Sequence, residues 1–225
     1  MEQVIYKIDE TFHQYIKDMS IQRSNIATII NKCKKEAHEL PEFPKNYYKG
    51  LMGERVAFNV LNNLNSGLDI QLWPSLHEIN PELDLKVWQT TKHDDYKNSE
   101  IEELRYHLFD SFDIRVGNAY INVKSRSVHM RPNNHTYLDI QQLQVERTPD
   151  MKYLGVALNY NGFKTQPTEG IILGCMDGED ILRCPITTSQ RYGKPHYRTF
   201  LSDYKDIQEI LDRESNKIAF AELQN

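Results

Sequence analysis

An aspartate and a lysine stand on the two arms of a predicted β-hairpin. Residues 112–116 and 119–124 alternate between apolar and polar side chains, which is typical of strands, and a Gly-Asn pair forms a two-residue turn between them. Side chains two apart on a strand share a face, so Asn122 and Lys124 point to the same side. Asp113 faces away from the apolar set of the first strand, so it can converge with Lys124 at the edge of the sheet.

These residue types suit the hydrolysis of phosphodiester bonds. A divalent metal ion neutralises the charge that develops on a phosphate and generates hydroxide near neutral pH. Magnesium prefers oxygen ligands and often takes only one or two protein carboxylates. A lysine beside the attacking water favours its deprotonation. Taken alone, however, the hairpin is equally compatible with an ion pair between Asp113 and Lys124 on an ordinary amphipathic sheet.

Helices and strands are predicted on both sides of the hairpin. A helix over 49–65 and a strand over 69–73 come before it, and a helix over 137–146 and a strand over 153–160 follow. Helices interspersed with strands indicate an α/β (α+β) fold, with a central mixed β-sheet flanked by helices.

The rest of the chain adds to this core. Residues 1–45 are predicted to form a helical N-terminal region, ended by prolines, and residues 74–98 show no clear period. The remaining predicted elements are a helix over 100–109, strand-length apolar segments at 170–176 and 180–184, and a last helix over 203–213. The length of 225 residues, 39% of them hydrophobic, favours one domain over residues 1–225.

Composition and charge narrow the class of protein. No apolar run approaches the roughly 20 residues of a membrane span, and no signal peptide is evident. Because three widely spaced cysteines also favour free thiols, we expect a cytoplasmic protein without a membrane partner. The net charge of −5 argues against a nucleic-acid partner. The distribution of charge favours a nucleic-acid partner, because residues 124–136 and 181–202 carry basic side chains and no acid.

Asp113 followed by Asn122-Val123-Lys124 resembles the signature of the PD-(D/E)xK nuclease superfamily. The segment 50–57, which contains Glu54, resembles the opening helix of that superfamily, and the predicted order of elements over about 49–160 is similar to its core. The resemblance implies a Mg²⁺ ion held by Glu54 and Asp113, with the Val123 carbonyl as a further ligand. It also implies that Lys124 is the catalytic lysine.

One position departs from this signature. The acid of the Asp/Glu-x-Lys motif is replaced by Asn122, which is neutral and a poorer metal ligand. The missing charge could come from Glu54, the interpretation that we favour, or from an acid of the next helix, Asp139 or Glu146. The remaining alternative is a protein that has lost catalysis.

A second set of residues matches the literal motif better. Asp69, Asp84 and Lys86 have the Asp…Asp-x-Lys pattern. Pro81 and Glu82, however, stand where the strand leading to the motif should be apolar and fully hydrogen-bonded, and no hairpin turn is evident. The sequence therefore favours the site around Asp113.

Within the resembled superfamily, the chain looks most like a type II restriction endonuclease. Such enzymes act as homodimers on double-stranded DNA and leave 5′-phosphate ends, and the alternatives are a structure-specific repair nuclease or an inactive DNA-binding protein. The insert at 74–110 and the segment 181–202 would then contact DNA. The candidate DNA-binding side chains are Arg126, Arg131, Asn133, Asn134, Tyr192, Lys194 and Arg198.

Overall fold

The chain divides into two compact units, each with its own hydrophobic core. The computed structural model describes residues 3–31, 43–64, 67–108, 112–162, 164–188 and 194–222. The first unit comprises Met1–Ile8, Gly53–Leu72 and Phe112–Asn225, and the second comprises Asp9–Met52 and Trp73–Ser111. The prediction of a single domain stays a prediction, because this division describes packing and not whether either unit folds alone.

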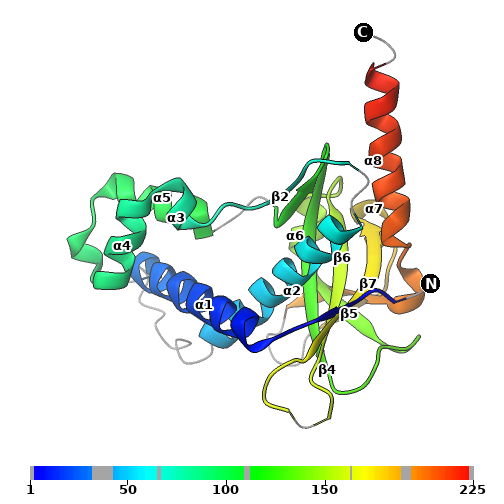
Figure 1. The fold of residues 1–225 in the computed structure, drawn as a ribbon, viewed down its shortest axis with the longest axis horizontal. Helices are drawn as coiled ribbons and strands as arrows, with labels where there is room; N and C mark the ends of the chain where they lie inside the picture. The colour runs from blue at the N-terminus through cyan, green and yellow to red at the C-terminus, as the bar shows by residue number, and fades with distance from the viewer. Residues whose placement is uncertain are drawn as a thin grey trace. The chain divides into compact units, whose positions relative to one another are not determined.

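The first unit is built on a six-stranded mixed sheet, which confirms the predicted α+β fold class (Figure 1). In spatial order, its strands are β1 (Ile5–Lys7), β7 (Glu169–Asp177), β6 (Lys152–Asn159), β4 (Ala119–Val128), β3 (Ile114–Val116) and β2 (Ile70–Leu72). Strands β2, β3 and β4 are antiparallel neighbours, whereas β6 runs parallel to β4. Strand β7 is antiparallel to β6 and to β1.

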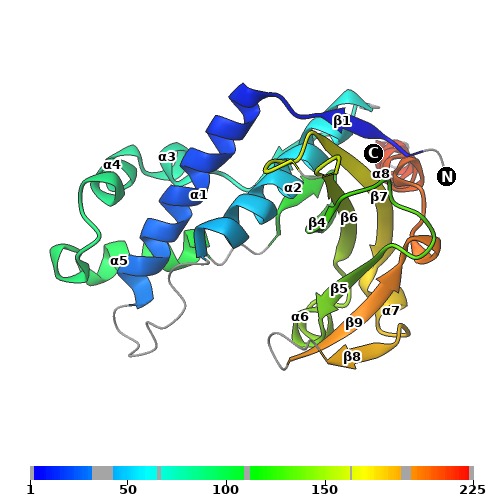
Figure 2. The ribbon, with the colours of Figure 1, turned by 90° about the horizontal axis from the view of Figure 1, so that it is seen from below.

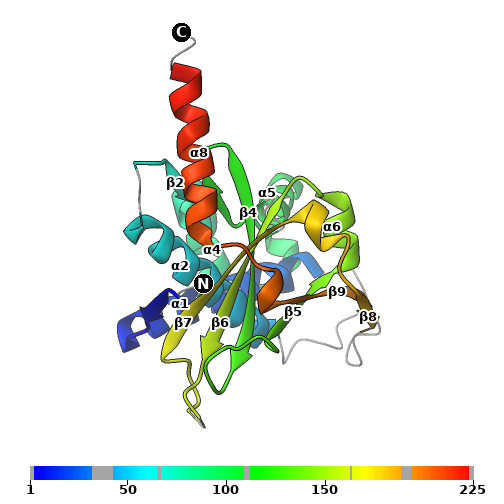
Figure 3. The ribbon, with the colours of Figure 1, turned by 90° about the vertical axis from the view of Figure 1, so that its right-hand side faces the viewer.

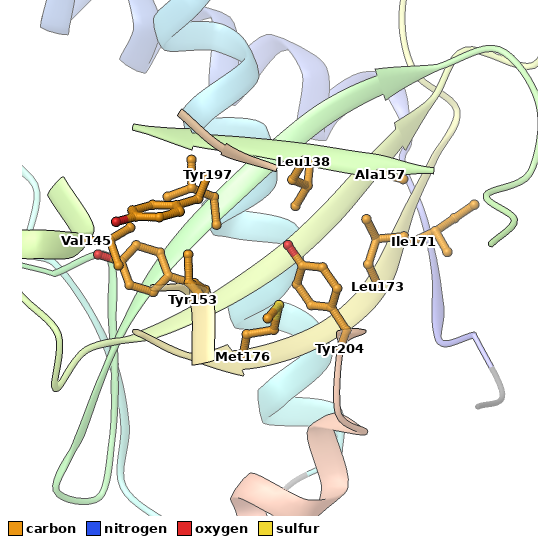
Figure 4. Packing of buried hydrophobic residues seen from close by; sticks show 11 residues of the cluster. Leu138, Val145, Tyr153, Ala157, Ile171, Leu173, Met176, Tyr197 and Tyr204 are labelled. Carbon is orange, nitrogen blue, oxygen red and sulfur yellow. The ribbon is translucent and has the colours of Figure 1, made fainter. Parts of the chain in front are cut away.

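A smaller sheet packs on one face of the main sheet. Its order is β5 (Tyr137–Gln141), β9 (Pro195–Phe200) and β8 (Ile186–Thr188), and the short helices α6 (Gln142–Arg147) and α7 (Gly178–Ile181) accompany it. Figure 4 shows the core between the sheets, where Leu138 and Tyr197 of the small sheet meet Tyr153 and Leu173 of the large one. These side chains are buried and shield the facing surfaces of β6 and β7 from water.

Helix α2 (Phe43–Asn63) covers the opposite face with its second half. A Cβ added at Gly53 would lie 2.7 Å from Ser125 Cβ of β4, and one added at Gly170 would lie 2.5 Å from Val56 Cγ1. Neighbouring side chains on a strand point to opposite faces. Since Ser125 faces α2, Asn122 and Lys124 face the small sheet. The unit ends with the 3-10 helix η3 (Leu201–Asp203) and α8 (Ile207–Glu222), which Figure 3 shows rising from the end of the chain's last strand.

The second unit is helical in its described residues. It contains α1 (Glu10–Asn31), the first half of α2, α3 (Leu76–Ile79), α4 (Pro81–Gln89), the 3-10 helix η2 (His93–Asp95) and α5 (Asn98–Leu108). Helix α1 packs along α4 and α5 (Figure 2). Ile26 and Ile29 of α1 meet Leu83 of α4 and Leu104 of α5 in its core.

The structure changes several predicted elements. Residues 5–7 form β1 and not helix, because β7 offers them an antiparallel partner. The segment 137–146 is a strand followed by a helix, which explains its mixed periodicity: Leu138 and Ile140 are buried at a spacing of two. Residues 178–181 are helical, where a strand-length segment was predicted at 180–184. Among the described residues, no helix is both long and apolar enough to cross a membrane.

Candidate active site

The predicted hairpin is present, and Asp113 lies where its first strand begins. Val116 pairs with Ala119 around the turn, and Ile114 pairs with Ile121. Just before β3, Asp113 is only 6% exposed, and its Oδ2 accepts a hydrogen bond from the Val123 N–H at 2.5 Å. The carboxylate therefore takes the place of a backbone acceptor at the end of the β3–β4 ladder. This contact fixes Asp113 against the strand that carries the motif.

The same contact orients the Val123 carbonyl. An extended residue directs its N–H and C=O toward the same neighbouring strand. Because the Val123 N–H points to Asp113, its carbonyl oxygen lies on the Asp113 side of β4. The two oxygens predicted to bind a metal thus share one side of this strand.

Asn122 has a buried oxygen with no partner. The residue is 8% exposed, and its Oδ1 accepts no hydrogen bond from any described residue. Asp113 lies outside the paired residues of β3, and its N–H donates to the carbonyl of Ile121, the residue before Asn122, at 3.0 Å. A buried acceptor left unsatisfied costs about 1–3 kcal/mol, and a native protein seldom keeps one without an ion, a water molecule or a function.

Tyr153 of β6 lies beside Asn122 on the neighbouring strand. It pairs with Asn122 across the parallel β4–β6 ladder and is fully buried. Burial is the main cause that raises the pKa of its hydroxyl; the hydrogen bond with Thr148 lowers it, and the nearby charge of Asp113 raises it. Sequence reasoning missed Tyr153, because the parallel register that brings it beside Asn122 leaves no local pattern.

Lys124 lies two residues beyond Asn122 on the same face of β4. It pairs with Gly155 of β6 and is partly exposed. Asp113 thus contacts Val123, and Asn122 and Lys124 share one face of β4, whereas the convergence of Asp113 with Lys124 stays a prediction.

Glu54 approaches the sheet from the other face. It follows Gly53, the point at which α2 comes closest to Ser125 of β4, and it is partly exposed. Within the described residues, no group of three or more His, Cys, Asp or Glu side chains is placed to hold a metal ion. A shared metal site of Glu54 and Asp113 therefore stays a prediction.

The two other acids that could replace the missing charge have partners elsewhere. Asp139 lies on β5, not on a helix, and both of its oxygens accept hydrogen bonds from Arg198, at 2.9 and 3.1 Å. Glu146 of α6 accepts a hydrogen bond from Gln142 at 2.6 Å and a long one from the Tyr197 hydroxyl at 3.5 Å. Both oxygens of Asp139 are thus already bound to Arg198.

The second set of motif residues does not form a strand motif. Asp84 and Lys86 lie on helix α4, where side chains two apart do not face each other. Asp84 accepts a hydrogen bond from Gln22, and Lys86 forms an ion pair with Glu100 at 2.9 Å. Asp69 belongs to the other unit and pairs with Arg115 at 2.9 Å.

The DNA-binding candidates fall into two groups. The guanidinium carbons of Arg126 and Arg198 lie 3.8 and 4.1 Å from the ring centroid of Tyr137, so both side chains are held by the protein. The second group is exposed and consists of Arg131, Asn133 and Asn134 in the β4–β5 loop and Lys194 before β9. Tyr192 lies outside the described residues.

Comparison of the chain with protein-family models, with curated protein sequences and with solved structures finds no match. The geometry of the site therefore carries the functional argument by itself.

Proposed function

We propose that the chain is a Mg²⁺-dependent endonuclease of the PD-(D/E)xK kind, acting on double-stranded DNA. The observation that carries the proposal is the buried Oδ1 of Asn122, which has no hydrogen-bond partner among the described residues and adjoins Val123, the residue that fixes the Asp113 carboxylate. An ordinary cross-strand ion pair gives no reason to keep a buried amide oxygen unsatisfied.

The donor set suits magnesium. A carboxylate from Asp113, an amide oxygen from Asn122 and a carbonyl oxygen from Val123 are all hard ligands, and Mg²⁺ takes few protein oxygens and keeps several waters. When bound, the ion would neutralise phosphate charge and lower the pKa of a coordinated water. Glu54 is the proposed source of further negative charge.

Each residue of the chain has a separate task in this proposal. The Val123 N–H holds Asp113 in place before any metal binds, so the ligand needs little reorganisation. Lys124, on the same face as Asn122 and partly exposed, positions the attacking water and favours its deprotonation. The core order of α2, β2–β3–β4, α6 and β6 supports the proposal, because it is similar to the order in the resembled superfamily.

At a finer level, we propose a type II restriction endonuclease that acts as a cytoplasmic homodimer and leaves 5′-phosphate ends. This rests on analogy with the resembled superfamily. A structure-specific repair nuclease would share the same chemistry.

DNA binding without cleavage is a second candidate function. It is favoured by the neutral Asn122 at the acidic position of the motif, which leaves Asp113 as the single carboxylate on the hairpin beside it. In this case Asn122 would mark a lost metal site.

Incubation of supercoiled plasmid with Mg²⁺ or with EDTA separates the two functions. We expect the wild type to cut only with Mg²⁺ and Lys124→Ala not to cut. Lys86→Ala is the matched control, since Lys86 is a partly exposed lysine of the other motif. Cutting by Lys124→Ala at the wild-type rate would refute the assignment of the active site to the hairpin. A loss of cutting in Lys86→Ala alone would assign the active site to α4 instead. Binding of DNA without any cutting would establish the second candidate.

A further inference from the structure

Two loops at one end of the main sheet are joined into a single structure, the double-loop lobe, defined by the described residues 129–136, 160–162 and 164–168 (Figures 1 and 3). The Tyr160 N–H donates to the Val128 carbonyl at 2.9 Å, and the Gly162 N–H donates to the His129 carbonyl at 3.1 Å. His129 Nδ1 also lies 2.8 Å from the Gly162 carbonyl oxygen. The β4–β5 and β6–β7 loops thus support each other.

The double-loop lobe carries two exposed cationic side chains that have no acidic partner among the described residues. Neither of its two segments contains an Asp or a Glu, although the chain has a net charge of −5. Arg131 and Lys164 are exposed, and neither forms an ion pair within the described part of the chain. The nearest acids along the adjoining strands are Asp139, which binds Arg198, and Glu169, which accepts a hydrogen bond from Asn159.

Strand β4 connects this lobe directly to the candidate site. Lys124 and Val128 are four residues apart on β4, which corresponds to about 13 Å at roughly 3.3 Å per residue. Phosphates follow each other at about 3.4 Å along the axis of a DNA strand, so this length spans about four nucleotides. The lobe therefore begins at a distance from Lys124 that corresponds to about four nucleotides.

We propose that the double-loop lobe grips the phosphate backbone of the DNA substrate, several nucleotides from the cleavage position, through Arg131 and Lys164. The inference rests on the proposed function and names a part of the substrate-binding surface. Because backbone phosphates carry no sequence information, the grip adds affinity and not sequence preference.

The test is the salt dependence of binding to a fluorescent duplex in EDTA, where Mg²⁺-dependent cutting cannot occur. Each lost phosphate contact lowers the slope of log K against log[salt] by about 0.9. We expect Arg131→Gln/Lys164→Gln to lower that slope by about 1.8 and to weaken binding at least tenfold. The matched control is Arg147→Gln/Arg213→Gln, which removes two exposed arginines of the same unit outside the segments predicted to contact DNA, and it should leave the slope within 0.5 of the wild type.

The outcomes separate the lobe from the function. If the wild type binds DNA, the proposed role of the lobe would be overturned by an unchanged salt slope in the lobe variant. An equal decrease of the slope in the control variant would overturn it as well. A wild type that fails to bind duplex at low salt would overturn the proposed function itself. Thermal melting of each variant shows whether the fold is intact, and substitutions in exposed loops should leave it unchanged.

Discussion

Replacing Asn122 by aspartate tests the metal site through stability, independently of cleavage. Asn122→Asp restores the acid of the resembled motif and introduces a second negative charge next to Val123, whose N–H binds the Asp113 carboxylate. Opposite and diagonal neighbours on antiparallel strands have Cβ atoms about 5–8 Å apart. Two unit charges about 5–8 Å apart repel by roughly 2–3 kcal/mol at an effective dielectric constant of about 20. With Asn122 only 8% exposed, water screens this repulsion little.

Without metal, the variant is therefore expected to lose about 2–3 kcal/mol of unfolding free energy at pH 8. For a protein of this size, each kcal/mol corresponds to roughly 2–4 °C, so the melting temperature should fall by about 4–12 °C. Mg²⁺ should restore most of this, since a ligand at 100 times its Kd stabilises by about 2.7 kcal/mol. The gain in melting temperature from Mg²⁺ should thus be several degrees larger for Asn122→Asp than for the wild type.

Differential scanning calorimetry with EDTA or with Mg²⁺ measures this difference. Asn122→Leu is the counterpart, because it removes the unsatisfied oxygen without adding charge. It should melt at or above the wild-type temperature in EDTA and show no response to Mg²⁺. If Asn122→Asp lost stability and Mg²⁺ restored none of it, or if Asn122→Leu kept the full Mg²⁺ response, Asn122 would not be a metal ligand.

Two further predictions concern the elements that hold the site and the second unit. Gly53→Ala should destabilise the protein by about 1–3 kcal/mol in urea unfolding, because its new Cβ would lie 2.7 Å from Ser125 Cβ, and full stability would contradict the close packing of α2. Burial, followed by the charge of Arg23, lowers the pKa of His107 to about 4, so the stability it contributes is complete above pH 6.5 and is lost as the pH falls toward 4. Urea unfolding between pH 8 and 4.5 should show a flatter pH dependence for His107→Leu, and parallel curves would refute the assignment.

The sequence was sufficient for the parts of the site that depend on local pattern. Alternation and the Gly-Asn turn predicted the hairpin, and with it the shared face of Asn122 and Lys124 on β4. Local pattern failed where distant strands decide the structure. Ile5–Lys7 becomes a strand only because β7 pairs with it, and Tyr137–Gln141 becomes a strand through its pairing with β9.

Two features of the site could not be predicted from residue spacing. Whether Asp113 is free or held depends on the irregular end of β3, where its carboxylate accepts the Val123 N–H. The lack of a partner for Asn122 Oδ1 depends on everything packed around it, which no single segment encodes. Conversely, Asp84 and Lys86 match the motif in sequence but lie on α4, where helical geometry separates their side chains.

The most direct test of the central claim is a Mg²⁺ titration of plasmid cleavage by the wild type and by Asp113→Asn. The buried carboxylate of Asp113 is the single charged ligand that the hairpin supplies, and its amide replacement keeps the size of the side chain. We expect Mg²⁺-dependent cleavage by the wild type, with a loss of at least a hundredfold in Asp113→Asn. Equal cleavage by both proteins at every Mg²⁺ concentration would contradict it.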